Sequence, residues 1–105
     1  MIKIDFRLKS NLGDIMASLI LNLKKEYFLQ IKSGEKKEEL RLVNDYWSKR
    51  LENKVFDNVI IRLGYCKAGD KEREVIRPWK GYCKKIITHK HFGNNPVLVY
   101  AINLE

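Results

Sequence analysis

The chain has 105 residues, a length that fits one domain with a single modest hydrophobic core. Its hydrophobic content of 45% and charged fraction of 32% suit a globular protein, and no apolar run approaches the roughly 20 residues that span a bilayer. The first residues, MIKIDFRLKSNLGD, contain no continuous apolar segment of the kind found in secretory signals. We therefore expect a cytoplasmic protein without membrane contact, in which Cys66 and Cys83 stay reduced.

The formal net charge is +8, which biases the protein toward polyanionic partners. This charge is unevenly distributed, because the stretch from Val75 to Leu104 contains no Asp or Glu. The basic residues of this stretch are Arg77, Lys80, Lys84, Lys85 and Lys90, with His89 and His91 among them. Such a one-sided field is what a phosphate-facing surface needs.

The N-terminal residues 1–15 show no clear period and contain a turn at SNLGD. They fit an extra strand, a loose arm or an upstream translated extension, and the sequence does not choose among the three. Met16 opens the apolar stretch MASLILNL. We therefore take residues 16–105 as a single domain.

The apolar run from Leu19 to Leu23 predicts a buried strand. After it, Leu23, Tyr27 and Ile31 recur at intervals of four, which predicts one face of a helix. Gly34 stands just past this helix, at the position where a left-handed residue commonly ends one.

Leu40 and Leu42 alternate with Glu39 and Arg41, which predicts a short strand. On this interpretation the leucines enter the core, and the two charged residues point together into a cleft. A competing interpretation runs one helix over residues 35–52, because lysine and glutamate favour helices.

The remaining elements are a second helix and a series of strands. NDYWSKRLEN predicts a helix with Asn44 or Asp45 as its N-cap. VFDNVIIRLGY, EVIRPW, KGYCKKIITHKH and PVLVYAINL predict strands, with EVIRPW at a sheet edge because of Pro78 and the last strand central because it is apolar on both faces. This order predicts an α+β fold, and closure into a small mixed β-barrel would remove exposed sheet edges.

The pattern Gly34-x-Lys36-x-x-Glu39-x-Arg41 resembles the G-x-K-x-x-E-x-R signature of the ASCH domain family. The resemblance covers about residues 19–104, and it implies a PUA-like β-barrel with two or so short helices packed against it. The segments DYWSKRL and HFGNNPVLVYAI are also similar to those of small phage or prophage members.

This resemblance implies binding of RNA or nucleotides in a cleft beside the barrel, with the signature lining one wall. Some bacterial members look like hydrolases that cut single-stranded RNA or deacylate an acetylated cytidine nucleoside. The alternative function is therefore a small hydrolase with Lys36 and Glu39 as catalytic residues. The deacylating group carries threonine where this chain has Glu39, and the later segment GYCKKIITHK offers Thr88 but no carboxylate.

The side-chain chemistry agrees with a binding site for nucleic acid. Arg41 can present a planar fork to a phosphate or a base edge, and Glu39 can orient that fork or accept from an amino group. Trp79 can stack a base beside basic residues, unless it fills part of the core. The predicted binding residues are Lys36, Glu39, Arg41, Arg77, Trp79, Lys80, Lys84 and Lys85.

No cofactor or metal is expected. His89 and His91 would lie on the same side of a strand, with Cys83 within reach, but their spacing matches no familiar zinc pattern. The expected partners are RNA, another single-stranded nucleic acid, or a free nucleotide or nucleoside, and the sequence leaves the oligomeric state open.

Overall fold

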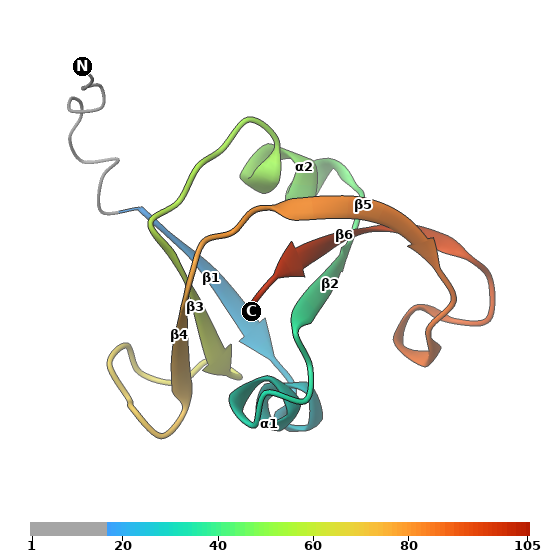
Figure 1. Cartoon of the computed structure of the whole chain (residues 1–105). Coiled ribbons are helices and arrows are strands. Elements are labelled where there is room, and N and C mark those ends of the chain that lie inside the picture. Colours follow the sequence, from blue (N-terminus) through green and yellow to red (C-terminus); the bar gives the residue numbers. More distant parts are fainter. Residues whose placement is uncertain (1–16) are drawn as a thin grey trace, which may run out of the picture.

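A computed structural model describes residues 17–105, and the prediction for residues 1–15 lies outside this range (Figure 1). The described elements follow one another as β1 (Ser18–Leu23), α1 (Lys25–Lys32), β2 (Glu38–Leu42), α2 (Asp45–Leu51), β3 (Asn58–Leu63), β4 (Glu74–Pro78), β5 (Tyr82–Ile87), the 3-10 helix η2 (Lys90–Phe92) and β6 (Val97–Asn103). The order of strands and helices is the predicted one, and the mixed α+β class is confirmed.

The strands form two three-stranded sheets, in the orders β1-β3-β4 and β2-β6-β5. Strands β1 and β3 run parallel, and every other pair is antiparallel. Between residues 17 and 105 no strand pairing joins the two sheets, so the expected closed barrel does not form. In a closed barrel every strand has a neighbour on both sides. Strand β4 instead ends at Pro78, which has no backbone N–H to donate to a further strand, and Gly81 then turns the chain with a φ of 79°.

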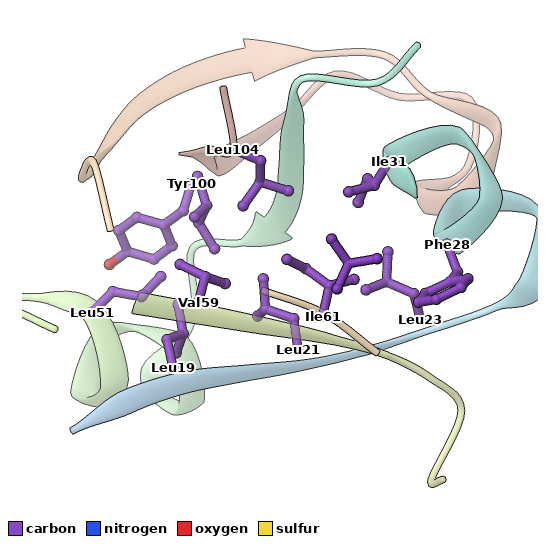
Figure 2. Close-up of a cluster of buried hydrophobic side chains, with 12 residues drawn as sticks. Leu19, Leu21, Leu23, Phe28, Ile31, Leu51, Val59, Ile61, Tyr100 and Leu104 are labelled. Atoms are coloured by element: carbon purple, nitrogen blue, oxygen red, sulfur yellow. The ribbon is translucent and has the colours of Figure 1, made fainter. Parts of the chain in front are cut away.

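One hydrophobic core fills the space between the sheets and helices. Figure 2 shows side chains from both sheets and both helices converging on this space. Its largest fully buried members are Tyr100, Phe28, Leu21, Ile31, Leu51, Ile61, Ile102 and Val59. Neither α1 nor α2 has the length and apolar surface that a bilayer-spanning helix requires.

Strand β6 holds the central position of its sheet, as its apolar sequence predicts. Val99 and Ala101 are buried on one face of the strand, and Tyr100 and Ile102 are buried on the other. Strand β4 lies at the edge of the other sheet, which confirms the prediction made from Pro78.

Helix α1 packs on the core and ends where the sequence predicts. Phe28 and Ile31 are its buried residues, and they lie three apart on one helical face. Gly34 follows the helix with a φ of 86°, a conformation that costs an L-residue roughly 1–2 kcal/mol. A glycine at this position therefore lets the chain leave the helix and enter β2 without strain.

The segment after Gly34 is a strand followed by a short helix, so the competing interpretation of one helix over residues 35–52 is wrong. Of the two predicted N-cap candidates, Asn44 is the N-cap of α2. Its side-chain oxygen accepts a hydrogen bond of 2.9 Å from the backbone N–H of Trp47. Leu51 anchors the other end of α2 in the core.

A polar network ties α2 to the sheet that contains β5 and β6. The carboxylate of Glu52 accepts hydrogen bonds from the hydroxyl of Tyr100 at 2.8 Å and from that of Tyr82 at 3.1 Å, and it pairs with Lys84 at 2.8 Å. The Tyr100 oxygen also shares a 2.8 Å hydrogen bond with the Ser48 hydroxyl. Hydrogen bonds from Lys84, Tyr100 and Tyr82 lower the pKa of Glu52 to about 2 from its ordinary value of 4.5.

Replacing Glu52 with glutamine should lower the free energy of unfolding at neutral pH, because the charge that these three donors stabilise is lost. A carboxylate with a depressed folded pKa adds stability above its unfolded pKa of about 4.5, and this stability disappears as the pH falls toward the folded value of about 2. The difference between parent and Glu52→Gln should therefore shrink over this window in urea denaturation curves.

The control is Glu35→Gln, since Glu35 is exposed and its side chain makes no hydrogen bond or ion pair within the described residues. This variant should unfold like the parent at every pH. A Glu52→Gln difference that stays constant from pH 7 to pH 2 would contradict the role of the charge.

Candidate functional site

A pocket with a volume of about 340 Å³ opens between the end of β1, the start of α1, strand β2, the start of α2 and the turn η2. Its charged lining residues are Lys24, Lys36, Glu39 and Arg41. Its ring-bearing lining residues are Tyr27, Trp47, His89, His91 and Phe92. The pocket thus combines basic groups, aromatic surfaces and a single carboxylate, contributed by segments that are far apart in the sequence.

Glu39 is the chemical centre of the pocket wall. Only 6% of this residue is exposed, and both carboxylate oxygens have cationic partners. Lys36 binds Oε1 through its ammonium group, and Nη2 of Arg41 lies 3.0 Å from Oε2. All three predicted signature residues therefore line one pocket, and they form a buried ion-pair cluster with a net positive charge.

As predicted, the side chains of β2 alternate between two faces. The more buried face is the one that carries Glu39, not the one that carries Leu40 and Leu42. Leu40 is half-buried and Leu42 is exposed, so the prediction that both enter the core is wrong. These leucines pair with Ala101 and Val99 of β6, which are both buried, so they have apolar neighbours on their own face. A two-residue period determines which side chains share a face of a strand, but not which face the rest of the chain covers.

Arg41 occupies a fixed position because of several contacts. Its guanidinium carbon lies 4.9 Å from the centroid of the Trp47 ring, and Nη2 also donates to the carbonyl oxygen of Asn22 at 3.2 Å. Its Nε is buried and has no hydrogen-bond acceptor anywhere in residues 17–105. An unpaired buried donor costs roughly 1–3 kcal/mol. The ion pair with Glu39 and the contact with Trp47 offset this cost.

Tyr27 connects the ion-pair cluster to the turn η2. The ammonium of Lys36 lies 5.4 Å from the centroid of the Tyr27 ring, and the ring of His91 lies 5.7 Å away in an edge-to-face arrangement. His89 lies 6.1 Å from Tyr27 by ring centroids. Together with the Arg41–Trp47 contact, these contacts make a continuous series of rings and charges along the pocket wall.

The prediction that His89 and His91 lie on a strand is wrong, because β5 ends at Ile87. Instead, Nδ1 of His89 accepts a 3.0 Å hydrogen bond from the backbone N–H of His91 and thereby caps η2. Gly93, with a φ of 100°, follows the turn. Within the part of the chain that the structure describes, no three His, Cys, Asp or Glu residues cluster in a way that could hold a metal ion.

The other predicted binding residues do not line this pocket. Three lysines of the acid-free stretch form ion pairs with glutamates from other parts of the chain: Lys84 with Glu52, Lys85 with Glu38 and Lys90 with Glu26. The fold therefore compensates much of the positive charge that the sequence concentrates in this stretch.

Arg77, Trp79 and Lys80 lie on or just after β4 and do not line the pocket. The Trp79 ring packs against the core and meets the Phe56 ring edge-to-face, with centroids 5.0 Å apart. Arg77 donates from Nη2 to the carbonyl of Ile31 at 3.4 Å, whereas Lys80 is exposed. Trp79 thus contributes to packing, which is the alternative considered for it.

Sequence reasoning missed several pocket residues, above all Tyr27 and Trp47. Each occupies an apolar position of its helix and packs partly against the core, so its residue type alone does not mark it as a pocket residue. The available signal was that both lie near the N-terminal end of a short helix that flanks the signature strand.

The chain matches no protein-family model, no curated protein and no solved structure. The function is therefore inferred from the geometry of the pocket and from the resemblance of its wall to a known signature.

Glu39→Gln should lower the free energy of unfolding by roughly 1–3 kcal/mol, because Lys36 and Arg41 would lose their charged partner in a largely buried cluster. Chemical denaturation at neutral pH measures this change. The matched control is Glu38→Gln, one residue earlier on the opposite face of β2, where an exposed pair with Lys85 is worth about 0–1 kcal/mol. Equal effects of the two substitutions would contradict a buried role for Glu39.

Proposed function

We propose that the pocket binds one nucleotide unit, either free or within single-stranded RNA. The observation that carries this proposal is the guanidinium of Arg41, which lies over Trp47 beside the buried carboxylate of Glu39. Single-stranded RNA is commonly recognised by stacking bases on aromatic rings or guanidinium planes and by hydrogen bonds to their edges. This pocket wall contains groups for both kinds of contact.

The guanidinium of Arg41 has hydrogen-bond donors and no acceptor, so it supports a ligand with an acceptor oxygen, such as a base carbonyl. Glu39 supports the site mainly as a positioning group, because both its oxygens already bind cations. It holds the Arg41 plane against Trp47, so that the guanidinium is oriented before a ligand arrives.

The size of the pocket supports a single unit as the ligand. Its volume of about 340 Å³ lies at the small end of the range for small-molecule sites, which is roughly 300–1,000 Å³. A base within a duplex would have to leave its stack to reach such a pocket, which costs a few kcal/mol, whereas a single strand or a free nucleotide avoids this cost. The net charge of +8 favours association with a polyanion.

Membership of the ASCH family and a cytoplasmic location are parts of the same proposal. Gly34, Lys36, Glu39 and Arg41 stand at the signature spacing, and the three charged residues line one pocket. Two sheets and two helices around one core are also compatible with an open variant of a PUA-like fold.

Arg41→Lys should weaken binding of the preferred nucleotide by about 1–3 kcal/mol. Lysine can still pair with Glu39, but it does not offer the planar guanidinium over Trp47 or its fork of donors. Calorimetric titration of the four nucleoside monophosphates and of short RNAs at fixed salt measures the change. Ligands that do not use Arg41 should bind as they do to the parent.

Arg62→Lys is the matched control for this experiment. The Arg62 side chain is 18% exposed and pairs with Glu74, while that of Arg41 is 20% exposed and pairs with Glu39. Arg62 lies on β3, outside the pocket, so this variant should bind like the parent. If both variants lose affinity equally, or neither does, the pocket is not the nucleotide site.

The hydrolase alternative is supported by one observation, the direct contact between Lys36 and Glu39 inside the pocket. Both oxygens of Glu39 are already bound by Lys36 and Arg41, so neither Lys36 nor Glu39 is free to take a proton from a substrate. We therefore expect no products when the protein is incubated with single-stranded RNA or with acylated nucleosides. Products that disappear in Lys36→Ala would instead establish the enzyme.

A further inference from the structure

The positive charge of the pocket is compensated only in part. Lys36 and Arg41 share the carboxylate of Glu39, which among the described residues is the one acid that lines the pocket. Lys24 also lines the pocket, and no carboxylate pairs with it within residues 17–105. It lies at the start of α1, about one helical turn before Tyr27. The uncompensated charge therefore lies on the α1 side of the pocket.

The turn η2 contributes hydrogen-bonding groups on this same side. Both His89 and His91 line the pocket and contact the Tyr27 ring. Because Nδ1 of His89 accepts from the backbone N–H of His91, its Nε2 carries the proton in the neutral ring and is the nitrogen that can donate to a ligand. His91 is exposed, so its imidazole is accessible to a ligand that enters the pocket.

The turn is also held near α1 by an ion pair. Lys90 lies 3.3 Å from the carboxylate of Glu26, one residue before Tyr27. This exposed contact gives the acid of the first turn of α1 a cationic partner. Lys24 and the two imidazoles thus line the pocket near Tyr27, and the one carboxylate that lines the pocket among residues 17–105, that of Glu39, is already bound by Lys36 and Arg41.

We propose that Lys24, His89 and His91 form a phosphate subsite, which binds the phosphate of the nucleotide whose base lies against Arg41 and Trp47. Cationic and N–H donor groups without a competing carboxylate suit a phosphate, which accepts charge-assisted hydrogen bonds. The ligand is then a phosphate-bearing nucleotide, and an uncharged nucleoside fills only part of the pocket. This inference rests on the proposed function, and it adds the chemical class of the ligand.

The test compares a nucleoside with its 5′-monophosphate by calorimetric titration at fixed pH and salt. The parent protein should bind the monophosphate at least about tenfold more tightly, since hydrogen bonds to a charged group are among the stronger ones. Lys24→Met should reduce this preference to within about threefold, because the phosphate loses a cationic partner. The matched control, Lys25→Met, removes the neighbouring exposed lysine, which does not line the pocket, and it should keep the full preference.

His91→Ala gives a second, independent reading, because His91 is exposed and its replacement leaves the core intact. It should reduce the preference for the monophosphate by about threefold. Circular dichroism shows that each variant is folded before it is titrated.

Equal affinity of the parent for nucleoside and monophosphate would overturn the phosphate subsite and leave the proposed function standing. Loss of the preference in Lys25→Met as well as in Lys24→Met would also overturn it, because the effect would then be general electrostatics. If the nucleoside, the monophosphate and short RNA all fail to bind over the same concentration range, the proposed function fails as well. A trinucleotide with and without a 5′-phosphate shows which phosphate of a strand the subsite binds. If it binds the phosphate at the 5′ end, the phosphorylated trinucleotide binds more tightly. If it binds an internal phosphate, the two trinucleotides bind alike.

Discussion

The burial of strand β6 on both faces is the constraint on which the rest of the structure depends. Because β2 pairs with β6, Glu39 lies opposite Ile102 and Arg41 lies opposite Tyr100, both of which are fully buried. A carboxylate in such surroundings must be paired, since an isolated buried charge is costly. Lys36 and Arg41 are the cations that pair with Glu39, and the carboxylate holds both in place. The guanidinium of Arg41 is thereby fixed over Trp47.

Helix α2 joins the pocket to a second polar network across the same sheet. Trp47 lines the pocket, whereas Ser48, the next residue, bonds to the hydroxyl of Tyr100. Tyr100 bonds in turn to Glu52, just after the helix. Glu39 is the acceptor of several donors in the pocket network, and Glu52 is the acceptor of several donors in the second one. Directional hydrogen bonds, as well as the burial of Leu51, therefore determine the position of α2. The Trp47 ring therefore lies on a helix that both directional hydrogen bonds and hydrophobic burial hold in position.

The net charge of the whole chain and the charge balance around individual side chains have different consequences. The net charge of +8 acts at long range on any polyanion. At short range, Lys84 and Lys85 are each paired with a glutamate, so part of the positive charge of the acid-free stretch is compensated locally. The pocket keeps uncompensated charge at Lys24, where charge and aromatic rings occur together. Recognition of a ligand is thus expected in the pocket, with the net charge contributing to the rate of encounter.

Local signals made much of the fold predictable from the sequence: Gly34 ended one helix, Asn44 capped the next, and apolar residues on both faces of the last strand placed it at the centre of a sheet. The spacing of the signature likewise brought its charged residues to one site. Only the tertiary structure decided that the Glu39 face of β2 turns inward, that Trp47 and other aromatic residues complete the pocket, and that the two sheets stay separate. The physical reason is range: caps and periods depend on residues within one or two turns, whereas burial, charge compensation and sheet closure depend on which distant segments meet.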